Sequence, residues 1–259
     1  MASTEQTLYE VRRGAAWIRL NRPEKRNALS AMLITETYDH LAAANADDAV
    51  RCVVITGNGP GFCSGADLKD DRGLPRGRDA AIEYPELLAA IQDSPKPVIA
   101  AVNGPAFAGG LGLVAAADIA IAVDSAQFSF SEVRIGVIPA IISVVCLPKL
   151  GRHHGMKLFL TGERFDGHRA VEMGLVHRAV PAGELESAVQ AEVDMIRLGG
   201  PNAVLECKKL VRQVMSLPRD QAFALTAPWS ARLFASAEAG EGMAAFREKR
   251  PAAWVREDD

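Results

Sequence analysis

The sequence has little that would mark a nucleic-acid-binding, metal-binding or disulfide-rich protein. Its 29 basic and 32 acidic residues give a formal charge of −3, so the basic surface that nucleic acid requires is not expected. The four cysteines lie far apart with no C-x-x-C pair, which excludes the usual zinc spacings and favours reduced thiols. Of the five histidines only His153 and His154 are close in sequence, and adjacent side chains point in different directions. We therefore expect neither a metal site nor a nucleic-acid partner.

Signals for export and for membrane insertion are also weak. The first ten residues carry Glu5 and Glu10 and no apolar run, so no signal peptide is expected. Residues 97–117 lack charge over a length that could span a bilayer, but Asn103, Pro105 and several glycines would break a helix midway. We expect a buried strand, a glycine-rich turn and a buried helix here. Together with the reduced thiols, this predicts a cytoplasmic protein with no membrane partner.

Short runs of β-branched and small apolar residues predict several buried strands. Glycine-rich turns follow, and each turn leads into a helix or another strand. That order favours repeated β-β-α units, and hence an α/β fold, over a doubly wound sheet. The three clearest runs lie at residues 50–56, 97–102 and 118–123.

The chain changes character after Gly199, Gly200 and Pro201. No strand signal remains beyond this point, and helices are predicted near residues 202–215, 219–237 and 241–248. We therefore divide the chain into a core at residues 1–200, which carries the site, and a helical region at residues 201–259.

Helix-start and helix-stop signals predict further elements within the core. Ser30 can cap a helix that runs to about Ala46. Further elements are expected as a helix at 80–92, a helix from about 140 with stops at Pro148 and Gly162, and a strand at 175–180.

Two glycine-rich segments each follow a buried strand. The first, at residues 57–68, matches neither a dinucleotide-binding fingerprint, nor a Walker loop, nor a serine-hydrolase elbow. The second, at residues 103–112, opens a helix whose first N–H groups lack intrahelical acceptors. Together the loops could direct two backbone N–H groups at one carbonyl oxygen, as in an oxyanion hole. The alternative is that the glycines only permit tight packing.

The motifs in and around these segments resemble those of the enoyl-CoA hydratase/isomerase (crotonase) family. The resemblance covers nearly the whole chain in the right order. It implies a crotonase-like spiral of β-β-α turns with a C-terminal all-helical region that drives trimerisation, giving a homotrimer or a dimer of trimers. It also suggests a role in fatty acid metabolism. The matching segments are at residues 65–69, 102–104, 108–110, 130–136, 160–163, 174–176 and 246–250.

The resemblance also implies how coenzyme A would bind. Ser64 and Leu68 fall where the family's backbone wraps the adenine, and Lys25 or Arg26 matches a basic position near the CoA phosphates. Lys249 matches another such position and would act on the ligand of a neighbouring subunit. A solvated surface is the alternative interpretation of these three cations. Since coenzyme A is part of the substrate, no separate cofactor is expected.

The resemblance places Ala66 and Gly109 at the two oxyanion-hole N–H groups and Glu132 at a catalytic carboxylate. The chain departs from the two-carboxylate pattern of typical hydratases, because Gly112 stands where the first glutamate would be. Glu132 must then move the proton alone or be assisted by another acid. Glu83, and Asp70 and Asp71 in the polar loop before it, are possible replacements, although solvated charges are the more ordinary interpretation.

We expect an enoyl-CoA hydratase, a hydro-lyase that adds water across the 2,3-double bond with Glu132 as acid and base. The single glutamate also suits a Δ3-Δ2-enoyl-CoA isomerase or a methylglutaconyl-CoA-type hydratase, and we place hydration narrowly ahead. A decarboxylase or thioesterase of the same superfamily, and a catalytically silent acyl-CoA-binding protein, remain further alternatives.

Overall fold

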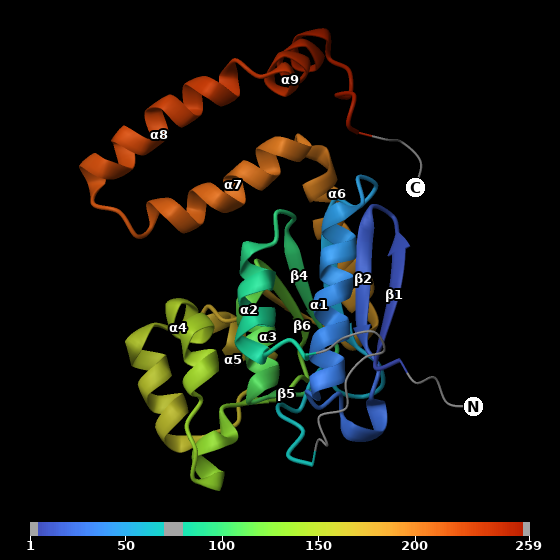
Figure 1. The fold of residues 1–259 in the computed structure, drawn as a ribbon, viewed down its shortest axis with the longest axis vertical. Helices are drawn as coiled ribbons and strands as arrows, with labels where there is room; N and C mark the ends of the chain where they lie inside the picture. The colour runs from blue at the N-terminus through green and yellow to red at the C-terminus, as the bar shows by residue number, and fades with distance from the viewer. Residues whose placement is uncertain (1–4, 70–79, 256–259) are drawn as a thin grey trace.

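A computed structural model describes residues 5–69 and 80–255 of the protein. The larger part of the molecule is built around a six-stranded sheet, above which the C-terminal helices project (Figure 1). Strand order in this sheet is β1-β2-β3-β4-β6-β8, and only the β1–β2 pair is antiparallel. The strands are β1 (Thr7–Arg12), β2 (Ala15–Leu20), β3 (Cys52–Gly57), β4 (Val98–Val102), β6 (Ile119–Val123) and β8 (Arg178–Val180), and a small second sheet pairs β5 (Ala106–Phe107) with β7 (Phe128–Ser129).

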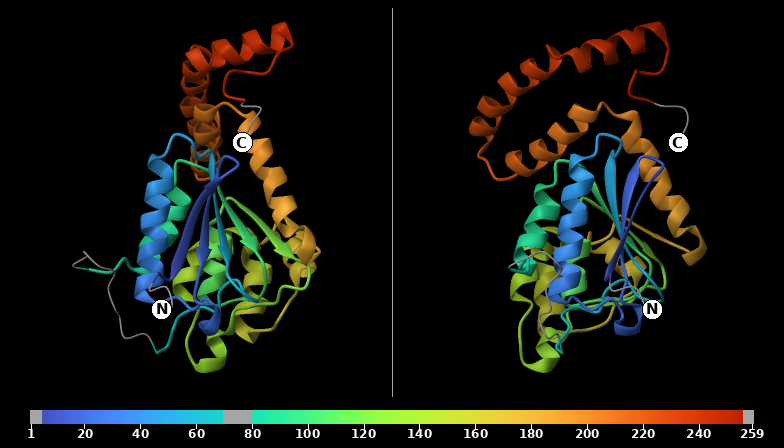
Figure 2. Two further views of the ribbon diagram at one scale, coloured as in Figure 1. Left: turned by 90° about the vertical axis from the view of Figure 1, so that its right-hand side faces the viewer. Right: turned by 45° about the vertical axis from the view of Figure 1, so that its right-hand side comes forward.

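Helices cover both faces of the large sheet. Figure 2 shows α1 and α2 on one face and α6 on the other. Strands β3 and β4 are buried along their whole length, as expected for parallel strands enclosed on both faces. The helices are α1 (Ala31–Ala46), α2 (Tyr84–Asp93), α3 (Gly109–Ala116), α4 (Ala140–Thr161), α5 (Gly167–Glu172), α6 (Leu185–Leu198), α7 (Pro201–Val214), α8 (Arg219–Phe234) and α9 (Ala237–Glu248), with short 3-10 turns η1 (Pro23–Lys25), η2 (Ser131–Ile135) and η3 (Ala182–Glu184).

Several predicted elements are confirmed. The Ser30 side chain accepts a hydrogen bond from the N–H of Leu33 at 3.1 Å, and α1 ends at Ala46. Residues 97–117 form β4, β5 and α3, as the broken apolar run predicts. No helix in the described part of the chain is both long enough and apolar enough to cross a membrane.

Several element boundaries differ from the prediction, among them those of α2, α4 and β8. Helix α2 begins at Tyr84 rather than near residue 80, because Glu83 and Glu86 form a reciprocal capping box at its start. Helix α4 does not stop at Pro148. It bends at Gly151, whose φ of 64° and ψ of 173° are non-helical, and ends at Gly162 as expected.

Strand β8 is shorter than the strand predicted at residues 175–180, because a turn takes up its first residues. The N–H groups of Leu175 and Val176 both donate to the carbonyl of Ala170 at the end of α5. These backbone groups are therefore committed to a turn, and pairing with β6 begins only at Arg178.

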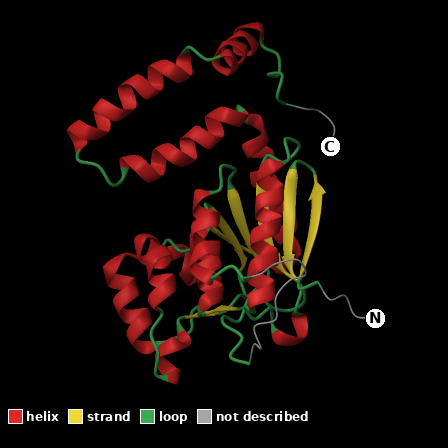
Figure 3. Cartoon of the chain, in the orientation of Figure 1, coloured by secondary structure: helices red, strands yellow, loops and turns green. Residues whose placement is uncertain are grey.

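The described residues after β8 form helices and connecting segments (Figure 3). Helix α7 begins at Pro201, close to the predicted change in character. It is attached to the body by ion pairs from Lys208 to Asp118 at 2.7 Å and from Arg212 to Asp93 at 2.6 Å. The division into two domains at residue 200 stays a prediction.

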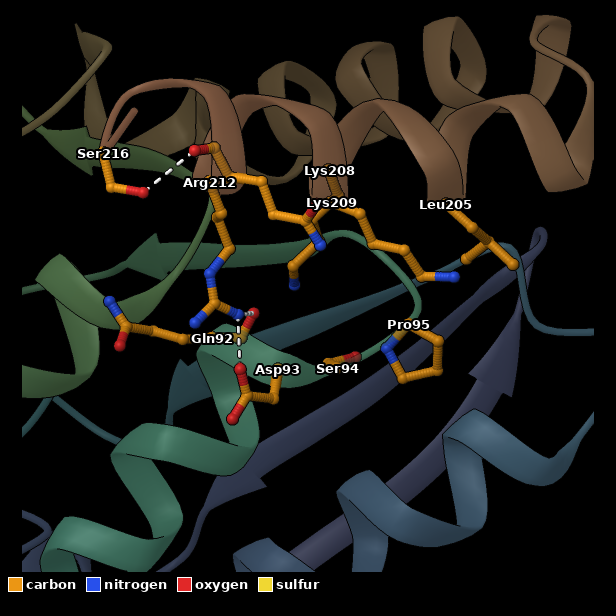
Figure 4. Close-up of a pocket in the computed structure, with 10 residues that line it drawn as sticks. Gln92, Asp93, Ser94, Pro95, Leu205, Lys208, Lys209, Arg212 and Ser216 are labelled. Carbon is orange, nitrogen blue, oxygen red and sulfur yellow. Dashed lines mark hydrogen bonds and ion pairs between the residues drawn. The ribbon is translucent and has the colours of Figure 1, made fainter. Parts of the chain in front are cut away.

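Figure 4 shows the depression between α7 and the end of α2. Its basic side chains are paired: besides the two ion pairs to Asp118 and Asp93, Lys209 contacts Glu206 at 2.7 Å. These ion pairs connect α7 to the part of the chain that forms the large sheet, and the lining of the depression is explained by them.

Candidate active site

A cavity of about 540 Å³ lies where the two glycine-rich segments meet the η2 turn and the start of α4. Five of the residues predicted for the site line it: Ser64, Ala66, Leu68, Gly109 and Glu132. The sequence places these residues in three separate segments, and the fold brings them to one surface. The remaining lining residues are Leu29, Ile34, Tyr84, Ala108, Ser131, Ile135, Val137, Ile138, Pro139, Ala140, Ile141 and Ile142.

The first glycine-rich segment holds Ala66 between two backbone hydrogen bonds. The N–H of Leu29 donates to the carbonyl of Gly65 at 2.8 Å, and the N–H of Asp67 donates to the carbonyl of Leu29 at 3.0 Å. Gly65 has a φ of 89°, a conformation that favours glycine. The N–H of Ala66 itself has no hydrogen-bond acceptor among the residues that the structure describes.

The second segment brings the start of α3 against the first. A β-carbon added to Gly65 would lie 3.1 Å from the nitrogen of Gly109, and one added to Gly109 would lie 3.7 Å from the nitrogen of Ala66. The two backbones therefore approach closely because neither glycine has a side chain. As the first residue of α3, Gly109 also has its N–H at the positive end of the helix dipole, with no acceptor found within residues 5–69 and 80–255.

An ion pair supports the first segment from behind. Arg22 donates to the carboxylate of Asp67 at 2.8 Å and to the carbonyl of Ala28 at 2.7 Å. The two paired side chains are only 13% and 9% exposed. The hydrogen bond from Arg22, joined by one from the N–H of Lys69, holds the pKa of Asp67 below its ordinary value. The side chain of Asp67 thus anchors the backbone directly after Ala66.

Glu132 lies in η2 with its carboxylate partly enclosed. Its Oε2 atom is buried and accepts no hydrogen bond from any described residue. Burial raises the pKa of the Glu132 carboxyl, while a hydrogen bond from its own backbone N–H opposes this rise. A carboxyl with a raised pKa is better suited to exchange protons near neutral pH.

Tyr84, at the start of α2, is a site residue that the sequence did not indicate. Its side chain lines the cavity and its hydroxyl donates a hydrogen bond to the carbonyl of Gly109. A β-carbon added to Gly112 would overlap this hydroxyl and lie 2.6 Å from a methyl group of Ile142. The space that a side chain at residue 112 would need is therefore already filled. Glu83, the neighbour of Tyr84, caps α2 and does not line the cavity.

The proposed substitutes Asp70 and Asp71 lie outside the described residues, so Glu132 is the one acidic side chain in the described lining. Lysine, arginine and histidine are likewise absent from that part of the lining. Much of the wall consists of apolar side chains that are exposed in the single chain: Leu68, Ile135, Val137, Ile138 and Ile141. The described surface thus suits an apolar group.

The predicted CoA contacts are only partly brought together. The N–H of Ser64 donates to the carbonyl of Arg26 at 3.0 Å, and its hydroxyl donates to the carbonyl of Lys25 at 3.3 Å. Lys25 and Arg26 are exposed, so these cations lie at the surface beside the cavity. Lys249 follows α9, which lies at the opposite end of the molecule from β5 (Figures 1 and 2). One chain therefore does not bring Lys249 to the cavity.

Two other reactive side chains, Cys63 and Asp118, have contacts that suit a structural role. Cys63 is fully buried, and burial raises the pKa of its thiol to about 12, which suits packing rather than nucleophilic attack. Asp118 accepts from the N–H of Val98 at 2.8 Å as well as from Lys208. Within the described ranges, no group of three or more histidine, cysteine, aspartate or glutamate side chains is arranged to hold a metal ion.

Comparison with known proteins shows the family to which the chain belongs. The family model for enoyl-CoA hydratase/isomerase matches residues 10–257. A Rhodobacter capsulatus protein named probable enoyl-CoA hydratase is 38% identical over 246 residues, covering 94% of this chain and 95% of the relative. An enoyl-CoA hydratase of Mycobacterium tuberculosis is 33% identical over 259 residues, covering 96% of this chain and 97% of the relative.

Solved structures show the same fold. The crystal structure of an enoyl-CoA hydratase from Mycobacterium smegmatis has a TM-score of 0.87 at 30% identity, covering 97% of this chain and 99% of the other. A Legionella pneumophila protein, whose name includes enoyl-CoA hydratase/isomerase (crotonase), has a TM-score of 0.88 at 35% identity, covering 97% of this chain and 100% of the other. The chain is a member of the enoyl-CoA hydratase/isomerase family and has the crotonase fold.

Proposed function

We propose that the protein is an enoyl-CoA hydratase that adds water across the 2,3-double bond of an enoyl-CoA thioester. One observation carries this proposal. Ala66 and Gly109, whose N–H groups have no acceptor among the described residues, line the same cavity as Glu132. Two donors and one proton carrier are the minimum that the reaction needs.

The two N–H groups act on the thioester oxygen. That oxygen accepts a hydrogen bond from each, which polarises the carbonyl and makes C3 more electrophilic. As the enolate forms, the negative charge on the oxygen is stabilised more strongly than the neutral carbonyl was. Interactions that strengthen towards the transition state are those that raise the rate.

Glu132 moves the proton. As the water oxygen bonds to C3, one water proton passes to the Glu132 carboxylate and the double-bond electrons move onto the thioester oxygen. A proton from Glu132 then goes to C2 and the carbonyl is restored. Water is added, Glu132 ends as it began, and the proposed reaction needs no cofactor.

The substrate is held by its two ends. Ser64 and Leu68 contact the adenine, Lys25 and Arg26 face the CoA phosphates, and the apolar wall around η2 takes the acyl chain. Because the described wall is largely apolar, we favour an uncharged acyl chain over a methylglutaconyl group, which carries a carboxylate.

We also propose that the protein is cytoplasmic and assembles as a homotrimer or a dimer of trimers, in which Lys249 reaches the phosphates of a neighbouring subunit's ligand. The C-terminal helices support this assembly because they carry exposed large apolar side chains that would be buried between subunits. These include Val211, Met215, Phe223, Phe234 and Phe246.

A Δ3-Δ2-enoyl-CoA isomerase is the second candidate, favoured by the single acid in the described lining. In that reaction Glu132 alone would carry a proton between C2 and C4 without water. Turnover of 2-enoyl-CoA and 3-enoyl-CoA thioesters in water labelled with heavy oxygen distinguishes the two reactions. A hydratase places the labelled oxygen in a 3-hydroxyacyl product, whereas an isomerase yields an unlabelled enoyl product.

Glu132→Gln tests the proposed proton carrier. This variant should lose nearly all hydration while binding an acyl-CoA ester with affinity close to that of the original chain. Retained hydration would mean that Glu132 is not the proton carrier. Binding without turnover of any thioester by the original chain would instead indicate a silent acyl-CoA-binding protein.

A further inference from the structure

Four polar side chains reach the described lining of the cavity: Ser64, Tyr84, Ser131 and Glu132. The hydroxyl of Ser64 is bonded to the carbonyl of Lys25. Tyr84 differs from both serines because its hydroxyl occupies the space next to Gly112 that a side chain at residue 112 would need. Its position is therefore fixed by the shape of α3 beneath it.

The hydrogen bonds of Tyr84 fix what its oxygen can offer. A phenol has one proton to donate and two lone pairs that can accept. The proton is donated to the carbonyl of Gly109. Because its proton is committed, this hydroxyl can only accept a hydrogen bond from any further partner.

Tyr84 stays neutral while it does so. Burial raises the pKa of the phenol well above its ordinary value, and nearby acidic groups, Glu132 among them, add to this effect. Tyr84 and Glu132 both line the cavity, so a small molecule bound there can contact both side chains. A neutral oxygen acceptor and a carboxylate thus share one cavity.

We propose that Tyr84 is a catalytic residue, whose hydroxyl oxygen holds the reacting water jointly with Glu132. The proposal rests on the proposed hydratase function. The water donates one hydrogen bond to the Glu132 carboxylate and the other to the Tyr84 oxygen, which leaves a lone pair free to attack C3. One water proton passes to Glu132 and the other stays on the new hydroxyl group. Tyr84 neither gains nor loses a proton.

The proposal explains how a site with one acidic side chain in its described lining can hydrate. A water held by a single carboxylate can rotate about that hydrogen bond, and the second acceptor removes this freedom. Orientation of a reactant is a large part of catalysis when it is held by more than one contact.

Two reactions of the same site provide the test. Hydration of 2-butenoyl-CoA requires a bound water, whereas deuterium exchange at C2 of butanoyl-CoA in heavy water requires only the oxyanion donors and Glu132. Tyr84→Phe should lower kcat for hydration about a hundredfold, the size of effect that a poorly oriented reactant can have. The exchange rate and the affinity for butanoyl-CoA should change less than about threefold. Glu132→Gln should abolish both reactions.

Tyr38→Phe is the matched control, because Tyr38 is a partly buried tyrosine on α1 that does not line the cavity. It should leave both reactions unchanged. If Tyr84→Phe fails to fold, difluorotyrosine at position 84 keeps the ring and its bond to Gly109 but weakens the oxygen as an acceptor. This replacement should lower hydration selectively as well.

The outcomes distinguish the two proposals. Unchanged hydration in Tyr84→Phe, or an equal fall in hydration and exchange, overturns the role of Tyr84 and leaves the hydratase function standing. If the original chain exchanges the C2 proton but hydrates no enoyl-CoA, the proposed function is wrong and the water-holding role is wrong with it.

Discussion

The hydroxyl of Tyr84 occupies the space into which any side chain on residue 112 would extend. This relationship joins the start of α2 to the first turn of α3, 28 positions apart in sequence. It gives a physical reason for a glycine where typical hydratases of the family have a glutamate: the site has replaced one side chain by another that arrives from a different helix.

Gly112→Ala should destabilise the protein by about 1–3 kcal/mol, the usual cost of overpacking a core, in spite of about 1 kcal/mol gained in helix propensity. The added methyl group would overlap the Tyr84 hydroxyl and crowd Ile142. The interaction free energy between residues 84 and 112 follows from denaturant unfolding of four proteins: the original chain, Gly112→Ala, Tyr84→Phe and the double variant. The alanine should cost less when residue 84 is phenylalanine, and an equal cost in both backgrounds would contradict the overlap.

The pH dependence of hydration should follow Glu132. Its carboxyl must be ionised to accept the water proton, and burial raises its pKa above the ordinary 4.5. The acid limb of kcat/KM should therefore bend at a pH above 4.5, with activity lost as pH falls through the raised pKa. A limb at or below 4.5 would show that another group controls the rate. The measurement is kcat/KM from initial rates of hydration across a series of acidic buffers.

The same shift makes a prediction about stability. A carboxyl whose pKa is higher in the folded than in the unfolded chain favours folding most below pH 4.5, and that contribution is lost as pH rises through the folded value. Glu132→Gln cannot ionise, so its free energy of unfolding does not fall in this way as the pH rises. The variant should therefore melt at a higher temperature than the original chain at pH 8, and the difference should shrink as the pH is lowered below 4.5. A lower melting temperature at pH 8 would show that the carboxylate is well compensated.

Asp67→Asn should weaken the support of Ala66. The pKa of Asp67 lies below its ordinary 3.8, so its pair with Arg22 stabilises the fold above that pH and is lost as pH falls through the lowered value. At pH 7 the variant should lose about 2 kcal/mol, as for hydrogen bonds to charged groups, and the loss should diminish in acid. Hydration should slow because the N–H of Ala66 is less well held.

Glu172→Gln is the control for this variant. It interrupts a pair with Arg169 in which both side chains are largely exposed, and such pairs contribute little. Comparable destabilisation by the two changes would mean that the Asp67 pair has no special role.

Local signals in the sequence predicted much of the fold. Ser30 has the side chain and the following apolar spacing that a helix start requires, and the structure has that cap. Pro148 is a poor guide because the helix continues through it, and the break falls at Gly151, which adopts a backbone conformation open to glycine. Such choices depend on packing against neighbouring helices, which a local pattern does not contain.

The sequence indicated some of the residues that line the cavity and missed others. Ala66, Gly109 and Glu132 were identified through resemblance, and the fold brings them to one cavity. Tyr84 was missed because nothing around it in the sequence indicates that its hydroxyl reaches α3. Lys249, which the resemblance also indicated, does not lie at the cavity in the single chain, and its proposed role needs a neighbouring subunit.

The most direct measurement is a crystal structure with a non-reactive enoyl-CoA analogue bound. We predict that the thioester oxygen lies within about 3.1 Å of the nitrogens of both Ala66 and Gly109, the range of a good hydrogen bond. A thioester oxygen bound away from these two nitrogens, with its reactive carbons out of reach of Glu132, would contradict the account.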